Sequence, residues 1–301
     1  MPPDFFRAFL SRISQFSEVT VELNPEDATL SYLRDLKESG INRISIGIQT
    51  LSDELLSFLG RRHSSKQALK ALENAVSVFE NVSVDIMFGM PGQTLQLIEK
   101  DLKQLLSFPL KHLSAYALTI YEGTPFYYQL SQNELIDDET AEEMYNLIRD
   151  VLKSEGFQHY EISNFAKEGF ECRHNIHYWQ MNNYEGFGPS AASFIANEYR
   201  KNYSNLDKYF SSLTAKELPV EEVVPFSRKD LKEIKLAMGL RLLSGVNLKT
   251  LGLKKDLEEK QELQVLIEEG YVEYEYPILK LTEKACFVSN YVISQIIKLI
   301  C

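Results

Sequence analysis

The stretch VDIMFGMPGQT, residues 84–94, joins a strand, a sharp turn and the start of a helix. Its apolar run, residues 84–88, is typical of a buried strand in a parallel sheet. Asp85 interrupts this run, and because an unpaired buried carboxylate is costly, the sequence predicts a partner or a ligand for it. Glycine and proline at 89–92 end the strand, and Thr94 stands at the N-cap of a helix whose leucines recur at helical spacing.

The same unit of strand and helix recurs on both sides of this stretch. Alternating or apolar runs bounded by turn residues predict strands at 19–23, 44–48, 82–88, 113–119 and 157–165. Helical spacing predicts helices at 4–16, 29–39, 52–59, 65–79, 94–107 and 137–155. A repeat of about 30 residues is typical of βαβ units, so the sequence predicts an α/β fold with a parallel sheet, either barrel-like or doubly wound.

The composition excludes several classes of protein. The net charge of −11 gives no electrostatic footprint for nucleic acid or an anionic membrane surface. Residues 1–16 carry charges within their apolar stretch, unlike a secretion signal, and no apolar run reaches the roughly 18 residues that span a bilayer. The three cysteines, Cys172, Cys286 and Cys301, lack CxxC spacing, so neither a disulfide framework nor a zinc ribbon is predicted, and a reducing cytoplasm is expected.

The C-terminal part follows a different pattern. Residues 201–226 are predicted to be a connector, and residues 227–301 a separate domain. Its expected elements are helices at 227–243, 248–255 and 261–269, a hairpin of 271–275 and 278–281, and a last helix from 282. This order outlines a winged helix. Glutamates 258, 259, 262, 268 and 269 would repel phosphate, so a structural or partner-docking role is favoured over DNA binding.

Polar residues cluster near the ends of the predicted parallel strands. They are Glu22, Gln49 and Asp85, followed by Tyr116 and Thr119, while Arg61 lies a short helix beyond Gln49. Sites form at the carboxyl ends of parallel strands, so these side chains are expected to meet. Carboxylates, an amide and a guanidinium suit a zwitterionic ligand with a ribose.

Each of these residues also has a structural interpretation. Glu22 would cap a helix, Gln49 would bond the backbone, Asp85 would pair with Arg43, and Arg61 would be solvated. The set at successive strand ends favours a ligand site.

A second candidate site is CRHNIHYW, residues 172–179. Cys172, His174 and His177 have the chemistry of zinc ligands, but they are only three and have no partner cluster elsewhere. Asn175, Tyr178 and Trp179 are more typical of a flat, partly polar ligand wall, and a loop held by its aromatic residues is the structural alternative. Small residues at 186–193 would also let the backbone approach a ligand closely.

The order of the motifs is more specific than any one of them. They are ELNP (22–25), NRISIGIQT (42–50), LGRRH (59–63), DIMFGMPGQT (85–94), SAYALT (114–119), YEIS (160–163), CRHNIHYW (172–179) and GFGPSAAS (186–193). Together they resemble the radical S-adenosylmethionine family of oxygen-independent coproporphyrinogen oxidases, in particular its HemW-type haem chaperones, which share HNxxYW. The resemblance covers nearly all 301 residues.

This resemblance implies particular roles for the candidate residues. Glu22, Gln49, Arg61 and Asp85 would contact S-adenosylmethionine, and Ala117 and Ala192 would line its pocket. His174, Asn175, Tyr178 and Trp179 would handle haem, with His174 as an axial ligand of the iron.

The sequence departs from the family in one respect. Members hold a [4Fe–4S] cluster on a CxxxCxxC loop and carry a GGGTP phrase, and neither motif is present. Residues 1–200 would then hold the last four strands of a six-stranded partial barrel. This is expected of a truncated gene model or a split gene, and a protein that lacks the cluster altogether is the alternative. The three scattered cysteines are not expected to assemble a cluster, so the chain is expected to be silent by the radical route.

The expected function is that of a HemW-like haem chaperone, which binds haem and S-adenosylmethionine and passes haem to an acceptor protein. One alternative is oxidative decarboxylation of coproporphyrinogen III in haem biosynthesis. Another is a degenerate, non-catalytic barrel that binds a partner protein.

Overall fold

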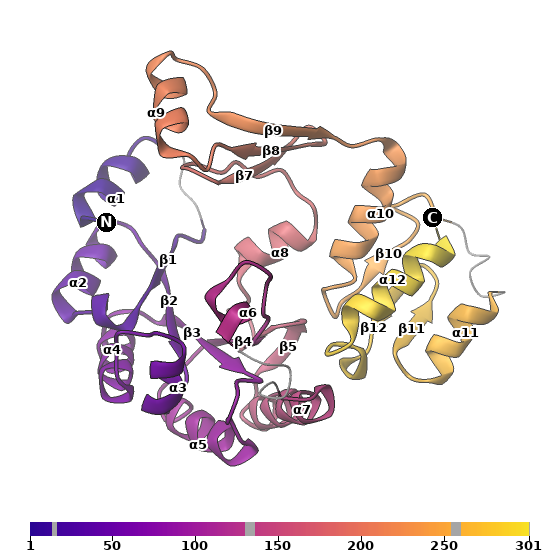
Figure 1. Ribbon diagram of the computed structural model, residues 1–301. Coiled ribbons are helices and arrows are strands. Elements are labelled where there is room, and N and C mark those ends of the chain that lie inside the picture. Colours follow the sequence, from indigo (N-terminus) through magenta and orange to yellow (C-terminus); the bar gives the residue numbers. More distant parts are fainter. Residues whose placement is uncertain (14–16, 130–135, 254–259, 301) are drawn as a thin grey trace. The chain divides into compact units, whose positions relative to one another are not determined.

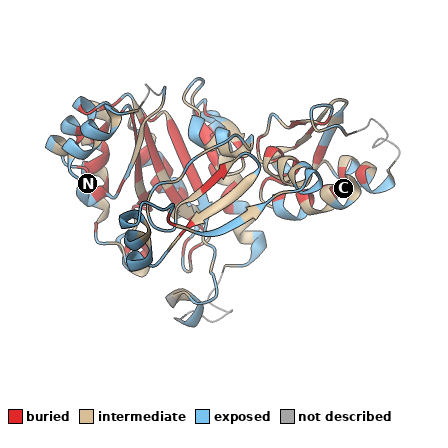
Figure 2. Ribbon diagram, turned by 90° about the horizontal axis from the view of Figure 1, so that it is seen from above, coloured by how far each residue is buried: buried red, intermediate tan, exposed pale blue. Residues whose placement is uncertain are grey.

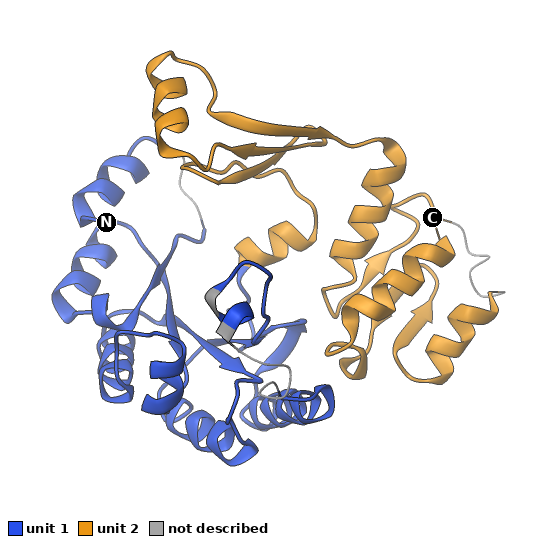
Figure 3. Ribbon diagram, in the orientation of Figure 1, with its two compact units in different colours: residues 1–172 blue, residues 173–301 orange. Residues whose placement is uncertain are grey.

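The computed structural model describes residues 1–13, 17–129, 136–253 and 260–300. The chain divides into two compact units, residues 1–172 and 173–301 (Figure 3). The division of the sequence into parts 1–200, 201–226 and 227–301 stays a prediction.

The first unit is built on one sheet with the strand order β1-β2-β3-β4-β6-β5 (Figure 1). Its strands are β1 (Thr20–Leu23), β2 (Arg43–Gln49), β3 (Asn81–Phe88), β4 (His112–Ala117), β5 (Gln158–Glu161) and β6 (Asn164–Ala166). The first four are parallel, as the sequence predicts, and β5 and β6 are antiparallel. The prediction of a single strand at 157–165 was wrong, because the chain turns at residues 162–163 and returns as a hairpin.

Several helices of this unit begin where the sequence offers a capping side chain. They are α1 (Pro3–Leu10), η1 (Pro25–Asp27), α2 (Leu30–Glu38), α3 (Asp53–Phe58), α4 (Ser65–Val78), α5 (Leu95–Leu105), α6 (Pro125–Gln129) and α7 (Asp138–Ser154). Thr29, Ser52, Thr94 and Asp137 each accept a hydrogen bond from a backbone N–H of the first turn. Helix α1 ends before the predicted residue 16, and residues 14–16 lie outside the described part.

One face of the sheet is apolar. Ile44, Ile46 and Ile48 alternate along β2 and are fully buried, and Val82, Val84, Ile86 and Phe88 continue this face on β3. Helices α4 and α7 contact these strands (Figure 1), and the arrows of the sheet are largely red in Figure 2. Burial of this face against helices is the main favourable term for folding.

The opposite face, which we call the polar face, carries the alternate residues of the same strands. It consists of Thr20, Glu22, Arg43, Ser45, Gly47, Asn81, Ser83, Asp85, Met87, His112, Ser114 and Tyr116, placed side by side by the strand register. Asp85 is therefore one of a row of polar side chains, not an isolated interruption of an apolar strand. Ser83 and His112 are fully buried, whereas Glu22 and Tyr116 are exposed.

The second unit begins with helix α8 (Arg173–Trp179). Strands β7 (Ala192–Ile195), β8 (Glu198–Asn202) and β9 (Val220–Pro225) form an antiparallel sheet in that order, and α9 (Leu206–Thr214) links the last two. The segment predicted as a connector, residues 201–226, thus holds regular structure.

The C-terminal elements form a hydrophobic core of their own. They are α10 (Arg228–Gly239), β10 (Val246–Asn247), α11 (Gln261–Glu268), β11 (Val272–Glu275), β12 (Ile278–Leu281), η4 (Glu283–Ala285) and α12 (Ser289–Ile300), packed around Leu236, Leu240, Leu263, Leu279 and Ile296. The predicted hairpin is confirmed. The predicted helix 248–255 is wrong over residues 248–253, which form turns, and residues 254–259 lie outside the described part; the last helix starts at Ser289 instead of 282.

In the part of the chain that the structure describes, no helix is both long enough and apolar enough to cross a membrane.

Candidate functional site

Asp85 lies within β3 on the polar face, three residues before the strand ends. The Ser45 hydroxyl donates to its carboxylate, at 3.1 Å from Oδ1 and 3.3 Å from Oδ2. Burial raises the pKa of Asp85, and the charge of Glu22 raises it further, while Ser114, Ser45 and Arg43 act in the opposite direction. A partly buried carboxylate with a raised pKa is a candidate for binding a ligand cation or hydroxyl. The structural alternative, a direct pair of Asp85 with Arg43, is not supported, because no ion pair joins these two described residues and Arg43 only lowers the pKa of Asp85 through its charge.

Gln49 ends β2 with an unusual backbone. Its φ is +68°, in the left-handed region that residues other than glycine rarely adopt. The register of β2 against β3 shifts between Gly47 and Gln49. The Gln49 amide lies back over Gly47, since a Cβ built on Gly47 would meet its Nε2 at 2.9 Å. The position of the Gln49 side chain therefore depends on the absence of a side chain at Gly47.

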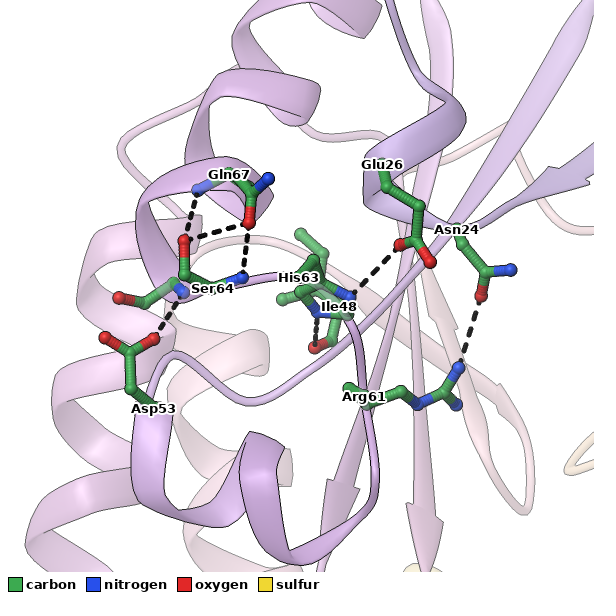
Figure 4. Close-up of polar contacts among 9 residues, drawn as sticks. Asn24, Glu26, Ile48, Asp53, Arg61, His63, Ser64 and Gln67 are labelled. Atoms are coloured by element: carbon green, nitrogen blue, oxygen red, sulfur yellow. Dashed lines mark hydrogen bonds and ion pairs between the residues drawn. The ribbon is translucent and has the colours of Figure 1, made fainter.

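Arg61 and His63 tie the loop after α3 to the ends of β1 and β2 (Figure 4). Arg61 Nη1 donates to Asn24 Oδ1 at 3.2 Å, and His63 Nε2 lies 3.3 Å from the Ile48 carbonyl oxygen. His63 Nδ1 is 3.5 Å from Glu26 Oε2. The loops that carry ELNP and LGRRH are thus joined at the carboxyl end of the sheet, beside Glu22 and Gln49.

A buried hydrogen-bonded chain runs across the polar face from β3 to β5. Ser83 Oγ is 2.8 Å from His112 Nδ1, and His112 Nε2 is 2.8 Å from Tyr160 Oη. The Cys172 backbone N–H donates to the same Tyr160 oxygen at 3.2 Å. Burial, with the charge of Arg43, lowers the pKa of His112 well below its ordinary value, and burial raises the pKa of Tyr160. Both groups are therefore held neutral near pH 7.

Helix α8 carries the second candidate site in the second unit. His174 is exposed, and its ring lies edge-on to Tyr178 at 4.4 Å between centroids. Tyr178 in turn lies edge-on to Tyr184 at 4.4 Å. Asn175 and Tyr178 are half-buried. An exposed imidazole beside aromatic rings suits a planar, metal-bearing ligand.

His177 is held in place by its neighbours. Its Nε2 is 2.8 Å from the Asn183 carbonyl oxygen, and Asn182 Nδ2 is 3.3 Å from its Nδ1. Cys172 is buried in the first unit, with Sγ 3.6 Å from Glu18 Oε1. Among the described residues no group of three or more His, Cys, Asp or Glu side chains has the arrangement of a metal site. The zinc alternative therefore has no support.

Trp179 turns toward the C-terminal helices. The Arg241 guanidinium lies 5.2 Å from its ring centroid, and Arg241 Nη2 donates to Asn290 Oδ1 at 2.9 Å. This contact covers one face of the indole, while its Nε1 is buried without a hydrogen-bond partner. The Trp179 ring therefore packs against Arg241, while its indole N–H lacks a hydrogen-bond acceptor.

The structure brings some of the predicted site residues together and leaves others apart. Glu22, Gln49 and Asp85 lie on or beside the polar face, and Arg61 reaches the loop after β1. Ala117 ends β4 and is exposed, as is Thr119 beyond it, whereas Ala192 begins β7 in the second unit. Sequence reasoning missed Ser45, Gly47 and His112, although the alternation RISIGIQ at 43–49 contains the signal for the first two.

Comparisons with known proteins define the class. Residues 1–105 match the family model of the radical SAM superfamily. The fold resembles the structure described as coproporphyrinogen III oxidase (HemN) from Escherichia coli, a radical SAM enzyme, with a TM-score of 0.79, 18% identity, and coverage of 98% of this chain and 73% of that chain. A fold of this kind, with a polar face at a parallel sheet, is that of a radical SAM α/β protein.

Relatives found by sequence identify the family within the radical SAM class. The chain is 34% identical over 294 residues to the heme chaperone HemW of Bacillus subtilis, covering 95% of this chain and 78% of that protein. It is 39% identical over 241 residues to the bovine mitochondrial radical S-adenosyl methionine domain-containing protein 1, covering 76% of this chain and 54% of that protein. The chain belongs to the HemW family.

Proposed function

We propose that this chain binds S-adenosylmethionine at the carboxyl end of its parallel sheet and haem at helix α8, and that it passes haem to an acceptor protein. The observation that carries the proposal is the gathering of Glu22, Gln49 and Asp85 at one end of the polar face in a member of the HemW family.

The polar face fits S-adenosylmethionine. Glu22 and Asp85 are carboxylates that accept hydrogen bonds from ribose hydroxyls or the ligand ammonium, and the Gln49 amide both donates and accepts. Arg61 would hold the ligand carboxylate, exchanging its bond to Asn24 for a charge-assisted one. Ala117, exposed at the end of β4, offers an apolar contact, and the assignment of Ala192 to S-adenosylmethionine stays a prediction.

The described residues do not fit a [4Fe–4S] cluster. Cys172 and Cys286 are buried in different units, and Cys301 lies outside the described residues. The sequence has no CxxxCxxC loop. We therefore propose ligand binding without cofactor cleavage for these residues, and a partial barrel for the parallel strands.

Helix α8 fits haem because it carries an imidazole next to aromatic rings. His174 is exposed and its ring lies edge-on to Tyr178. His174 would be the axial ligand, as its place in the HNxxYW motif implies, and Asn175, Tyr178 and Trp179 would line the porphyrin. The buried, unpaired Nε1 of Trp179 is a donor available to a bound group.

Two titrations test the proposal on the whole 301-residue chain. In the first, haem is added to the apoprotein and its Soret absorption is followed to saturation, with protoporphyrin without iron as the control. In the second, S-adenosylmethionine is titrated calorimetrically, with S-adenosylhomocysteine as the control. A saturable haem complex with one equivalent bound, transferred to an added apo-haem protein faster than free haem, supports the chaperone role. A chain that binds neither ligand would be the non-catalytic partner-binding barrel.

A further inference from the structure

Gln49 is the central residue of a rare turn. The Thr50 N–H donates to the Ile48 carbonyl oxygen at 2.9 Å, closing a three-residue γ-turn, and the φ of Gln49 is +68°. The γ-turn with positive φ is strained for a residue with a side chain. Such a conformation persists only where its neighbours fix it, so the surroundings of Gln49 must supply the restraint.

Asp101 on helix α5 supplies the restraint after Gln49. Its Oδ2 accepts a hydrogen bond from Thr50 Oγ1 at 2.6 Å and another from the Leu51 N–H at 2.9 Å. Asp101 is 6% exposed, so its carboxylate is buried. A buried carboxylate is expensive unless paired, and here its partners are the two residues that follow Gln49.

His63 supplies a restraint before Gln49. Its Nε2 lies 3.3 Å from the Ile48 carbonyl oxygen, the same oxygen that closes the γ-turn. A carbonyl oxygen only accepts, so Nε2 carries the hydrogen. Glu26 Oε2 lies 3.5 Å from the other ring nitrogen, Nδ1 (Figure 4). The backbone is thus held on both sides of Gln49.

We propose that Asp101 is a positioning residue for ligand binding: through Thr50 and Leu51 it holds the γ-turn at Gln49 and so presents the Gln49 amide over Gly47 toward the ligand. His63 completes this arrangement from the other side. The inference rests on the proposed function, because it takes S-adenosylmethionine as the ligand that the amide contacts.

The test compares Asp101→Ala with Asp101→Asn, because an asparagine Oδ1 still accepts both hydrogen bonds. Calorimetric titration with S-adenosylmethionine should give a dissociation constant about tenfold weaker in D101A, the size expected for one restrained polar contact, and nearly normal affinity in D101N. In a Gln49→Ala background the D101A substitution should cause little further loss, since the two residues act as a unit. Glu99→Ala, at an exposed acidic residue on the same helix, is the matched control.

Hydrogen exchange of the Leu51 amide separates this inference from the proposed function. The amide should lose protection in D101A and keep it in D101N, whether or not S-adenosylmethionine binds. If the parent chain shows no affinity for S-adenosylmethionine while Leu51 behaves in this way, the proposed ligand is wrong and the restraint stands. If D101A and D101N weaken binding equally, or if D101A and Q49A are additive, Asp101 does not position Gln49 and the inference is overturned.

Discussion

The amide nitrogen Nε2 of Gln49 lies 2.9 Å from the position that a Cβ atom on Gly47 would occupy. The backbone of Gly47 is not in the left-handed region, so its glycine is explained by this close approach rather than by its φ. The two residues stand on one strand, and the smallness of the first determines where the side chain of the second can lie.

The first prediction concerns Gly47→Ala. The added methyl group displaces the far end of a flexible side chain, so the strand should keep its fold while the Gln49 amide moves. We expect S-adenosylmethionine to bind about tenfold more weakly, the loss of roughly one hydrogen bond, with an unfolding temperature close to that of the parent chain. The double variant G47A/Q49A should bind like Q49A alone; a further loss of affinity in the double variant would show that Gly47 acts by another route.

The second prediction concerns Asp85→Asn, which should affect stability and binding in opposite directions. The pKa of Asp85 is raised on folding, so the folded state holds this proton to a higher pH than the unfolded state. Folding stability is therefore lost as pH rises from about 3.8, the ordinary aspartate value, through the folded pKa, and an asparagine avoids that loss.

At pH 7 we accordingly expect D85N to unfold at higher denaturant concentration than the parent chain, with Ser45 still donating to the amide oxygen. Its affinity for S-adenosylmethionine should fall about tenfold or more, because hydrogen bonds to a charged group contribute roughly 1.5–3 kcal/mol. Denaturant titrations at pH 4 and pH 7 and calorimetry measure the two effects. Tighter binding by D85N would exclude the carboxylate as a ligand contact.

The third prediction is a pH dependence carried by His112. Its pKa is lowered well below 6.5 on folding, so the unfolded state binds the proton more readily. Stability is fully present above about pH 6.5 and should fall as pH drops toward the folded pKa, by up to about 1.4 kcal/mol per pH unit for one group.

His112→Gln keeps a donor and an acceptor for Ser83 and Tyr160 without the titration. The difference in unfolding free energy between parent and H112Q should therefore change between pH 7.5 and pH 5, in favour of the variant at the lower pH. Parallel stability curves for the two proteins would show that His112 is not the group that titrates.

The fourth prediction separates the two histidines of helix α8. His174→Ala should abolish the Soret band of an axially ligated haem complex, since it removes the proposed axial ligand. His177→Ala is the matched control on the same helix: it removes the hydrogen bond to the Asn183 carbonyl and should cost about 1 kcal/mol of stability while leaving the spectrum unchanged. Loss of the haem band in H177A with retention in H174A would reverse the assignment.

The sequence by itself determined the parallel strands, most helix starts and the family. These depend on local signals: alternation and apolar runs, capping residues such as Thr29 and Thr94, and an ordered series of motifs. The single strand predicted at 157–165 and the helix predicted at 248–255 failed because residue pattern alone does not reveal a turn at 162–163 or the packing that holds 248–253 in turns.

Only the tertiary structure decided how the candidate residues act. Asp85 accepts a hydrogen bond from Ser45, which lies on the neighbouring strand and 40 residues away in the sequence. The restraint on Gln49 comes from Asp101 on helix α5. Strand register and helix packing bring such residues together, and neither is encoded in the spacing of a motif. The sequence determined which chemical groups are present, and the fold decided which of them are buried, strained or free to meet a ligand.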